Sequence, residues 1–476
     1  MSVFSGPVPH RIRIIQGAGA IAFGVKDNGF SFFLLIFYNQ VLGMEAATVG
    51  AALALALIVD ALIDPLIGNL SDRTYTRWGR RLPWLYLAPL PLAVMWVMLW
   101  HPPGGEAPDF WGLFGICVAV RLLLSACEVP SIALVPELTS DYDERTTLFR
   151  YRFLSGWIGG LLMMVLAFAV FMRGPEGILS PEGYGAFGIA GAVIIVLSVM
   201  GSAAGLHRLV ARSPESRPPP FSLRASFAEI REAFAEPAFL IFAGGALAAY
   251  VSQGMTFSLS QYVNTFVWQF DTAAFNLFPL ALGISAIIMF LIVSPLHRRY
   301  GKPLTAAAGA LTAFGVAFTP YMLFLLGFWP QPGSTASTAW YFPFLIVGNT
   351  AGIVSMISAT SMVAEIVEAF EQRTGRRAEG SFYSGNWLVQ KCATGAGIFL
   401  SGQIVGFTQI PAAAQPGEVG DGPLATLIIL YGLLSAILAC ITAWFLVRFP
   451  ISREDHEARL AALGAAARAD PDASIT

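Results

Sequence analysis

Long apolar runs, separated by short polar breaks, make up most of this chain. A helix needs about 20 apolar residues to cross the ~30 Å hydrocarbon layer of a membrane, because each residue adds ~1.5 Å. Runs of this length predict twelve spanning helices, at about residues 12–42, 47–70, 82–100, 110–136, 150–172, 184–206, 238–266, 273–295, 304–328, 341–364, 381–406 and 423–448. We therefore expect an all-α, polytopic membrane protein.

The composition supports the same class. The 476 residues are 56% hydrophobic and 12% charged, with a mean hydropathy of +0.65. A soluble domain usually carries about twice that charged fraction. The net charge of −2 gives no support to a nucleic-acid partner. We expect membrane lipid and a small molecule as the partners of a monomer.

Basic residues occur in alternate loops. One set of loops carries clusters at 10–13, 73–81, 145–152, 208–231, 298–302, 373–377 and 448–459, whereas the other set has Arg173 as its only cation. Basic loops stay on the cytoplasmic side of a membrane. The alternation predicts a multi-pass protein of the bacterial inner membrane, with both termini in the cytoplasm.

A polar segment divides the predicted spans into two groups of six. It covers residues 207–237 and contains "SPESRPPP". The loops "SDRTYTRWGRRLP" and "HRRYGKPLT" occupy equivalent places in the two groups, as in a parallel 6+6 repeat. We predict an N-terminal bundle (1–206), a cytoplasmic linker (207–237), a C-terminal bundle (238–448) and a cytoplasmic tail (449–476).

Few ionisable residues lie within the apolar runs. They are Lys26, Asp27, Asp60, Asp64, Arg121, Glu128 and Lys391, with Arg152 near the start of a run. Each costs about 2.5–3.5 kcal/mol at the centre of a membrane helix, so each needs a partner or water. By helical rise, Asp60 and Lys391 both lie about 15 Å, and Asp64 about 9 Å, from the cytoplasmic ends of their helices.

Asp60 and Asp64, hereafter the acid pair, are spaced i,i+4 and share one helix face about 6 Å apart. Two carboxylates this close in a low dielectric do not both remain ionised without a cation. The pair is therefore expected to share a proton, to bind Na⁺, or to contact Lys391 or Lys26. A permanent structural salt bridge is the alternative.

Arg121, Ser125 and Glu128 fall on one face of the fourth predicted span, which allows an ion pair within the helix or a role in a site. Near Lys391, the cluster of Asn386, Trp387 and Gln390 suits sugar binding, because an aromatic face stacks on C–H groups while amides bind hydroxyls. Packing against lipid is the alternative for Trp387. In the seventh span, polar residues predict the lining of a wet cavity; they are Tyr250, Gln253, Thr256, Gln261, Tyr262 and Asn264.

Features of enzymes are missing from the apolar runs. All five histidines lie in loops or at helix ends, and there is no Gly-rich phosphate loop followed by Lys-Ser/Thr. We expect no catalytic residues, no cofactor and no resident metal, apart from Na⁺ if the acid pair binds it.

The segment "DALIDPLIGNLSDRTYTRWGRRLPW" closely resembles the signature of the glycoside–pentoside–hexuronide:cation symporters, the melibiose-permease-like branch of the major facilitator superfamily. Three further segments resemble this family: "GVKDNGF", "CEVPSIALVPELTSDYDERTTLFRYRFLSG" and "AEIVEAFEQRTGRRAEGSFYSGNWLVQK". The resemblance implies a twelve-helix major facilitator fold and sugar–cation symport by alternating access, with a co-transported H⁺ or Na⁺.

The resemblance also implies roles for individual residues. It implies a cation site at Asp60 and Asp64, coupling by Lys391, and substrate contacts by Asp27, Glu128 and Arg152; we add Lys26, Asn386, Trp387 and Gln390 as candidates. Ile63 stands where sodium-using members have an amide or hydroxyl, which favours H⁺ over Na⁺. Glu128 replaces an Asp and Ile132 an aromatic residue, so an amphiphilic or lysolipid-like substrate stays open. A receptor of the same fold that does not transport its ligand also stays open.

The basic loop after the second span is a candidate gate. We expect Arg73, Arg80 and Arg81 to form a cytoplasmic latch with Asp72 and the region of Glu365 and Glu368, stabilising the outward-facing state. A role in topology alone is the alternative.

Overall fold

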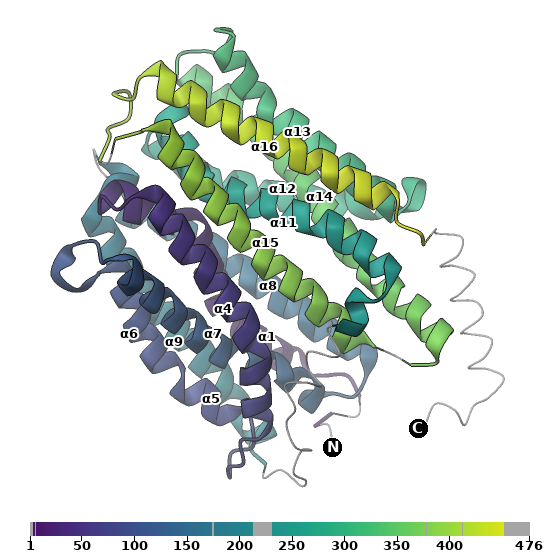
Figure 1. Ribbon diagram of the computed structural model, residues 1–476. Helices are drawn as coiled ribbons and strands as arrows, with labels where there is room; N and C mark the ends of the chain where they lie inside the picture. Colours follow the sequence, from purple (N-terminus) through teal and green to yellow (C-terminus); the bar gives the residue numbers. More distant parts are fainter. Residues whose placement is uncertain are drawn as a thin grey trace.

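The computed structural model describes residues 3–4, 6–173, 176–212, 231–376, 378–411 and 413–451. Within them the regular elements are helices, and no strand occurs (Figure 1). Part of the predicted linker, residues 213–230, and most of the predicted tail, 452–476, lie outside the described residues.

Most predicted spans are single long helices. They are α4 (Ala46–Asp72), α7 (Phe110–Leu138), α8 (Tyr142–Leu166), α9 (Pro181–Val210), α11 (Pro237–Tyr262), α12 (Thr272–Tyr300), α13 (Lys302–Leu325), α14 (Thr335–Thr374), α15 (Glu379–Thr408) and α16 (Asp421–Val447). α14 is 40 residues long, and at ~1.5 Å per residue it extends well beyond a hydrocarbon layer.

Two predicted spans are interrupted helices. The first consists of α1 (His10–Ala18), α2 (Ile21–Asn28) and α3 (Leu34–Ile36), with π-helical turns at Gly29–Phe33 and Phe37–Val41. The third is split at Ala88 into α5 (Leu82–Leu87) and α6 (Pro89–Trp100). Pro89 has no N–H to donate to the preceding turn, which explains the break.

Ten helical segments of the described chain have the length and hydropathy of a membrane span. The α5–α6 pair and α15 occupy the two remaining predicted positions but do not meet these criteria. Polar and charged residues such as Gln390 and Lys391 interrupt the apolar run of α15. The chain is a multi-pass membrane protein, and the count of twelve spans stays a prediction.

α4 and α15 lie side by side along much of their length (Figure 1). Glycines allow the close approach: a Cβ on Gly402 would lie 2.5 Å from the Ala46 carbonyl oxygen, and Gly50 faces the Cα of Gly402. Small residues at such positions let membrane helices pack backbone against backbone. The tightest contacts lie where α4 begins and α15 ends, at the end of the molecule opposite Asp72.

The same end contains further contacts between early and late helices. The rings of Phe32 and Phe257 stack at 4.7 Å, and Tyr262 donates a hydrogen bond to Asn39 Oδ1 at 2.9 Å. Gln40 Oε1 accepts from the backbone N–H of Ala414 at 3.3 Å. Hereafter this end is called the outer end, because the basic loops lie at the opposite one.

The prediction of a wet cavity beside the seventh span is wrong for the outer part of that span, which comprises the end of α11 and the π-helical turn Val263–Val267. Gln261, Tyr262 and Asn264 are fully buried between helices, and the side-chain amides of Gln261 and Asn264 have no hydrogen-bond partner among the described residues. Nearer the middle, Thr256 accepts a hydrogen bond from Tyr431, and Gln253 contacts the Met356 sulfur. These polar groups contact neighbouring helices. The pattern of polar residues along a single helix does not reveal such contacts.

Candidate functional site

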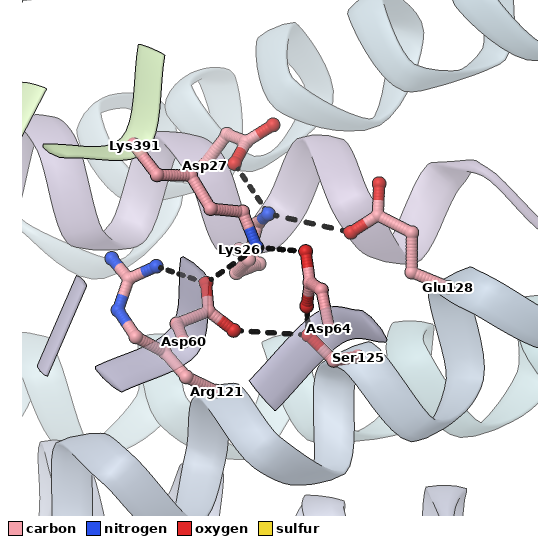
Figure 2. Close-up of polar contacts among 8 residues, drawn as sticks. All are labelled: Lys26, Asp27, Asp60, Asp64, Arg121, Ser125, Glu128 and Lys391. Atoms are coloured by element: carbon pink, nitrogen blue, oxygen red, sulfur yellow. Dashed lines mark hydrogen bonds and ion pairs between the residues drawn. The ribbon is translucent and has the colours of Figure 1, made fainter. Parts of the chain in front are cut away.

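The acid pair of α4 contacts Lys391 of α15. Lys391 Nζ lies 2.9 Å from Asp60 Oδ2 and 2.5 Å from Asp64 Oδ2 (Figure 2). The i,i+4 spacing turns both carboxylates to the same side, and the glycines of α15 bring its backbone close enough for the amine to reach them. One ammonium thus joins two helices that lie more than 300 residues apart in the chain.

Ser125 of α7 lies between the two acids. Its hydroxyl is 2.9 Å from Asp60 Oδ1 and 2.6 Å from Asp64 Oδ1. The hydroxyl has a single hydrogen, so it donates to only one carboxylate at a time. The other contact is a hydrogen bond only when that carboxyl itself bears a proton.

Arg121, one turn before Ser125, forms an ion pair with Asp60 at 3.2 Å. Its guanidinium carbon lies 4.4 Å from the centre of the Phe30 ring, and the side chain is 7% exposed. The ion pair within the helix that the sequence allowed is therefore not what Arg121 forms. Asp60, Asp64, Arg121, Ser125 and Lys391 are called the coupling cluster below.

A second charged group adjoins the coupling cluster. Lys26 Nζ lies 2.7 Å from Asp27 Oδ1 and 3.7 Å from Glu128 Oε2, between the two carboxylates (Figure 2). The lysine side chain is 15% exposed, whereas those of Asp27 and Glu128 are 66% and 34% exposed. The accessible surface of this group therefore belongs mainly to the two acidic side chains, Asp27 above all.

Arg152 of α8 is buried, with 6% of its surface exposed. Its Nη1 donates to Ser131 Oγ at 2.7 Å, and its guanidinium lies 5.8 Å from the Phe23 ring centre. Ser131 follows Pro130, whose ring interrupts the hydrogen bonding of α7 next to Glu128.

The candidate residues of α15 differ in exposure. Asn386 is 2% exposed, and its Oδ1 has no hydrogen-bond partner within the part of the chain that the structure describes. Trp387 is 47% exposed and Gln390 is half-buried. In the described part of the chain, none of the three belongs to the hydrogen-bonded network of the coupling cluster, so their predicted substrate contacts stay predictions.

Three of the predicted gate residues, Asp72, Arg80 and Arg81, form contacts within their own set of helices. Arg81 pairs with Asp72, approaches Glu137 at 3.4 Å and donates to Ser71 Oγ at 2.5 Å. Arg73 is exposed in the same loop, and the guanidinium of Arg80 lies 5.7 Å from the ring centre of Tyr75.

Glu365, the expected partner across the gate, instead contacts Lys302 at 2.7 Å. The predicted contact between Arg81 and the Glu365 region is thus not made in this conformation. Its existence in another conformation stays a prediction.

Three residues contact the charged side chains of the site in ways that the sequence did not predict. They are Ser125, Ser131 and Phe30. The position of Ser125 on the same helix face as Arg121 and Glu128 was the available signal for one of them. Among the described residues, no group of three or more His, Cys, Asp or Glu side chains is placed to hold a metal ion.

Comparisons with known proteins agree with this architecture. The "Uncharacterized symporter sll1374" of Synechocystis sp. is 26% identical, covering 93% of this chain and 94% of that protein. The "Isoprimeverose transporter" of Lactiplantibacillus pentosus is 28% identical, covering 84% and 80%. The crystal structure of a D-xylose-proton symporter, 13% identical, covers 92% of this chain and 97% of that chain with a TM-score of 0.60, which shows a major facilitator fold.

A family model described as "MFS/sugar transport protein" matches residues 15–453. This match spans nearly the whole chain, including both charged groups. The chain therefore belongs to the MFS/sugar transport protein family of symporters.

Proposed function

We propose that this protein is an H⁺-coupled symporter of a neutral sugar or glycoside-like solute in the bacterial inner membrane, with both termini in the cytoplasm. Residues 1–206 and 238–448 act as two six-helix bundles that rock about a central site. The observation that carries the proposal is the contact of Lys391 with both acids of the pair, because it places an exchangeable counter-ion between the two bundles.

Alternating access follows from breaking this contact. Lys391 occupies the acid pair when no cation is bound, which holds α4 against α15. A proton on the pair weakens the attraction between the pair and Lys391, since one of two negative charges is lost. Solute bound at Asp27, Glu128 and Arg152 then stabilises the rearranged bundles, so that proton and solute cross together.

The proton is favoured over Na⁺ by the geometry of Ser125. With one proton on Asp64, that carboxyl donates to Ser125 Oγ and Ser125 donates to Asp60 Oδ1, so the protonated pair stays hydrogen-bonded after Lys391 has left. Both Oδ1 atoms of the pair then have a hydrogen-bond partner: Asp64 Oδ1 donates to Ser125 and Asp60 Oδ1 accepts from it. Hard metal cations prefer several oxygen ligands, and Ile63 supplies no side-chain oxygen beside Asp64.

A neutral, hydroxyl-rich solute is favoured by the exposed carboxylates of Asp27 and Glu128. Ionised carboxylates only accept hydrogen bonds, so they suit hydroxyl donors and repel an anionic head group. The cations that would attract an anion, Lys26 and Arg152, are the buried members of the group. The similarity to a protein named an isoprimeverose transporter supports the same class.

Uptake by proteoliposomes tests the proposal. A panel of radiolabelled methyl glycosides, a methyl glucuronide and a lysophospholipid is offered under an inward H⁺ gradient, an inward Na⁺ gradient, or neither. We expect at least one neutral glycoside to accumulate under the H⁺ gradient alone. Accumulation driven by Na⁺ would overturn the choice of cation, and accumulation of the glucuronide or lysolipid alone would overturn the choice of solute. Saturable binding without movement under any gradient would make the protein a receptor.

A further inference from the structure

Arg121 is a buried cation of the coupling cluster to which the proposed transport cycle assigns no step. It contacts Asp60 Oδ2, the same oxygen that Lys391 reaches at 2.9 Å. Its side chain is 7% exposed, and the guanidinium carbon lies 4.4 Å from the centre of the Phe30 ring, within the ~6 Å range of a cation–π contact. Burial and this contact hold the guanidinium in place.

Arg121 and Lys391 differ in the helices that carry them. Arg121 lies on α7, which packs along α4 within the same predicted bundle, whereas Lys391 comes from α15 of the other bundle. A rigid-body movement of the bundles separates Lys391 from the acid pair but leaves Arg121 beside Asp60. Arg121 is therefore a counter-ion that is present throughout the cycle.

Because Arg121 stays beside Asp60, it contributes to the net charge of the site at which a transported cation binds. Without Lys391, the two carboxylates and Arg121 together bear one negative charge instead of two. One oxygen of Asp60 is already occupied by a guanidinium, while the other accepts from Ser125. A metal ion bridging both carboxylates would have to approach this fixed positive charge and share its oxygen, whereas a proton needs one oxygen of Asp64 only.

We propose that Arg121 determines cation specificity: its guanidinium is a built-in cation that excludes Na⁺ and Li⁺ from the acid pair. The inference rests on the proposed H⁺ coupling and gives it a residue-level cause. It distinguishes Arg121 from Lys26, which is held by Asp27 and Glu128 rather than by the acid pair.

The test uses the purified full-length protein and needs no substrate. Unfolding temperatures are measured in NaCl, LiCl and choline chloride for the wild type, Arg121→Gln, Arg121→Met and Lys391→Gln, with exposed Arg208→Gln as a matched control. Proton release after addition of NaCl to a weakly buffered sample gives a second readout, since a metal ion that binds the pair displaces its proton.

We expect NaCl to raise the unfolding temperature of Arg121→Gln or Arg121→Met by about 2 °C or more over choline chloride, because a ligand that binds only the folded state stabilises it. Proton release should accompany this shift. The wild type, Arg208→Gln and Lys391→Gln should show neither effect, because Arg121 still occupies Asp60 in all three.

The outcomes separate the inference from the proposed function. Stabilisation of the wild type by Na⁺ would overturn H⁺ coupling itself. An Arg121 variant that folds and remains indifferent to Na⁺ and Li⁺ would overturn the role of Arg121 alone. A Na⁺ response in Lys391→Gln would also overturn it, even if neither Arg121 variant folds, because the exclusion would then depend on the lysine.

Discussion

Tyr262 donates a hydrogen bond to Asn39 Oδ1 across the outer end of the molecule, at 2.9 Å and with both residues buried. Tyr262 ends α11, and Asn39 lies in the π-helical segment Phe37–Val41, so the bond joins the two predicted bundles. A further hydrogen bond from Gln40 Nε2 to Asn39 Oδ1 holds the amide in place. The bond is one of the contacts that close this end.

Tyr262→Phe should loosen the closed outer end. Loss of one buried hydrogen bond costs about 0.5–1.5 kcal/mol, which favours opening by up to about tenfold at 25 °C. We expect faster amide hydrogen exchange in residues 29–41, with exposed Tyr300→Phe as the control. Unchanged exchange in this segment would show that the bond contributes nothing to closure.

Asp64→Asn should separate exchange from accumulation. The amide keeps the shape of the carboxyl but removes the charge that attracts Lys391 and the oxygen that takes up the proton. We expect loss of H⁺-driven accumulation in proteoliposomes while exchange of solute down its own gradient persists. Exposed Asp143→Asn is the matched control. Accumulation at the wild-type level would remove Asp64 from coupling.

Ser125→Ala should impair proton-driven uptake without abolishing binding of solute. It leaves the two Oδ1 atoms of the acid pair without the hydroxyl between them, and hydrogen bonds to charged groups contribute about 1.5–3 kcal/mol. We expect H⁺-driven uptake to fall about tenfold or more, with recovery in Ser125→Thr, which restores a hydroxyl. Equal uptake by the alanine and threonine variants would contradict a role for the hydroxyl.

Gly402→Ala should prevent close packing of α4 and α15. A Cβ there would lie 2.5 Å from the Ala46 carbonyl oxygen, which real atoms do not tolerate, so the helices must separate. Gly406→Ala, one turn later, meets nothing closer than 3.8 Å and is the matched control. In a helix the control substitution is expected to stabilise by up to about 1 kcal/mol.

Thermal unfolding and the uptake rate measure this difference. We expect a lower unfolding temperature and slower uptake for Gly402→Ala than for Gly406→Ala. If both variants behave alike, the approach of the two backbones is not required for transport.

From depth, the sequence offered Lys391 as one of several partners for the acid pair, and the family resemblance implied its coupling role; the structure shows the contact. Asp60 and Lys391 lie at similar heights above the same membrane face, and charges at that depth need partners. The partner of Arg121 could not be predicted in this way. Most faces of these helices carry apolar residues. No polar stripe therefore indicates which face of each helix points toward its neighbours. Arg121 consequently had two candidate roles until the structure placed it beside Asp60.

The buried amides at the outer end of the seventh span show the same difficulty. Gln261 and Asn264 suggested water because polar side chains in lipid are unfavourable, but both are enclosed by other helices at the outer end. Likewise, the basic loop correctly suggested ion pairs around Asp72, yet the choice of Glu137 over Glu365 as a partner of Arg81 depends on the conformation of the bundles. The spacing of charges along the loops does not indicate which of these partners is in reach in the populated conformation.

Glu128→Gln should separate solute binding from cation coupling. Glu128 contacts Lys26 and lies outside the coupling cluster, and its carboxylate is among the exposed oxygens offered to hydroxyl groups. The amide keeps one acceptor but loses the charge, so hydrogen bonds from the solute weaken by about 1–2 kcal/mol. We expect the Kd for the glycoside identified by uptake to rise about tenfold, while any accumulation that remains is still driven by H⁺. Isothermal titration measures the Kd, and exposed Glu106→Gln is the control. An unchanged Kd with loss of H⁺ coupling would move Glu128 from the solute site to the coupling cluster.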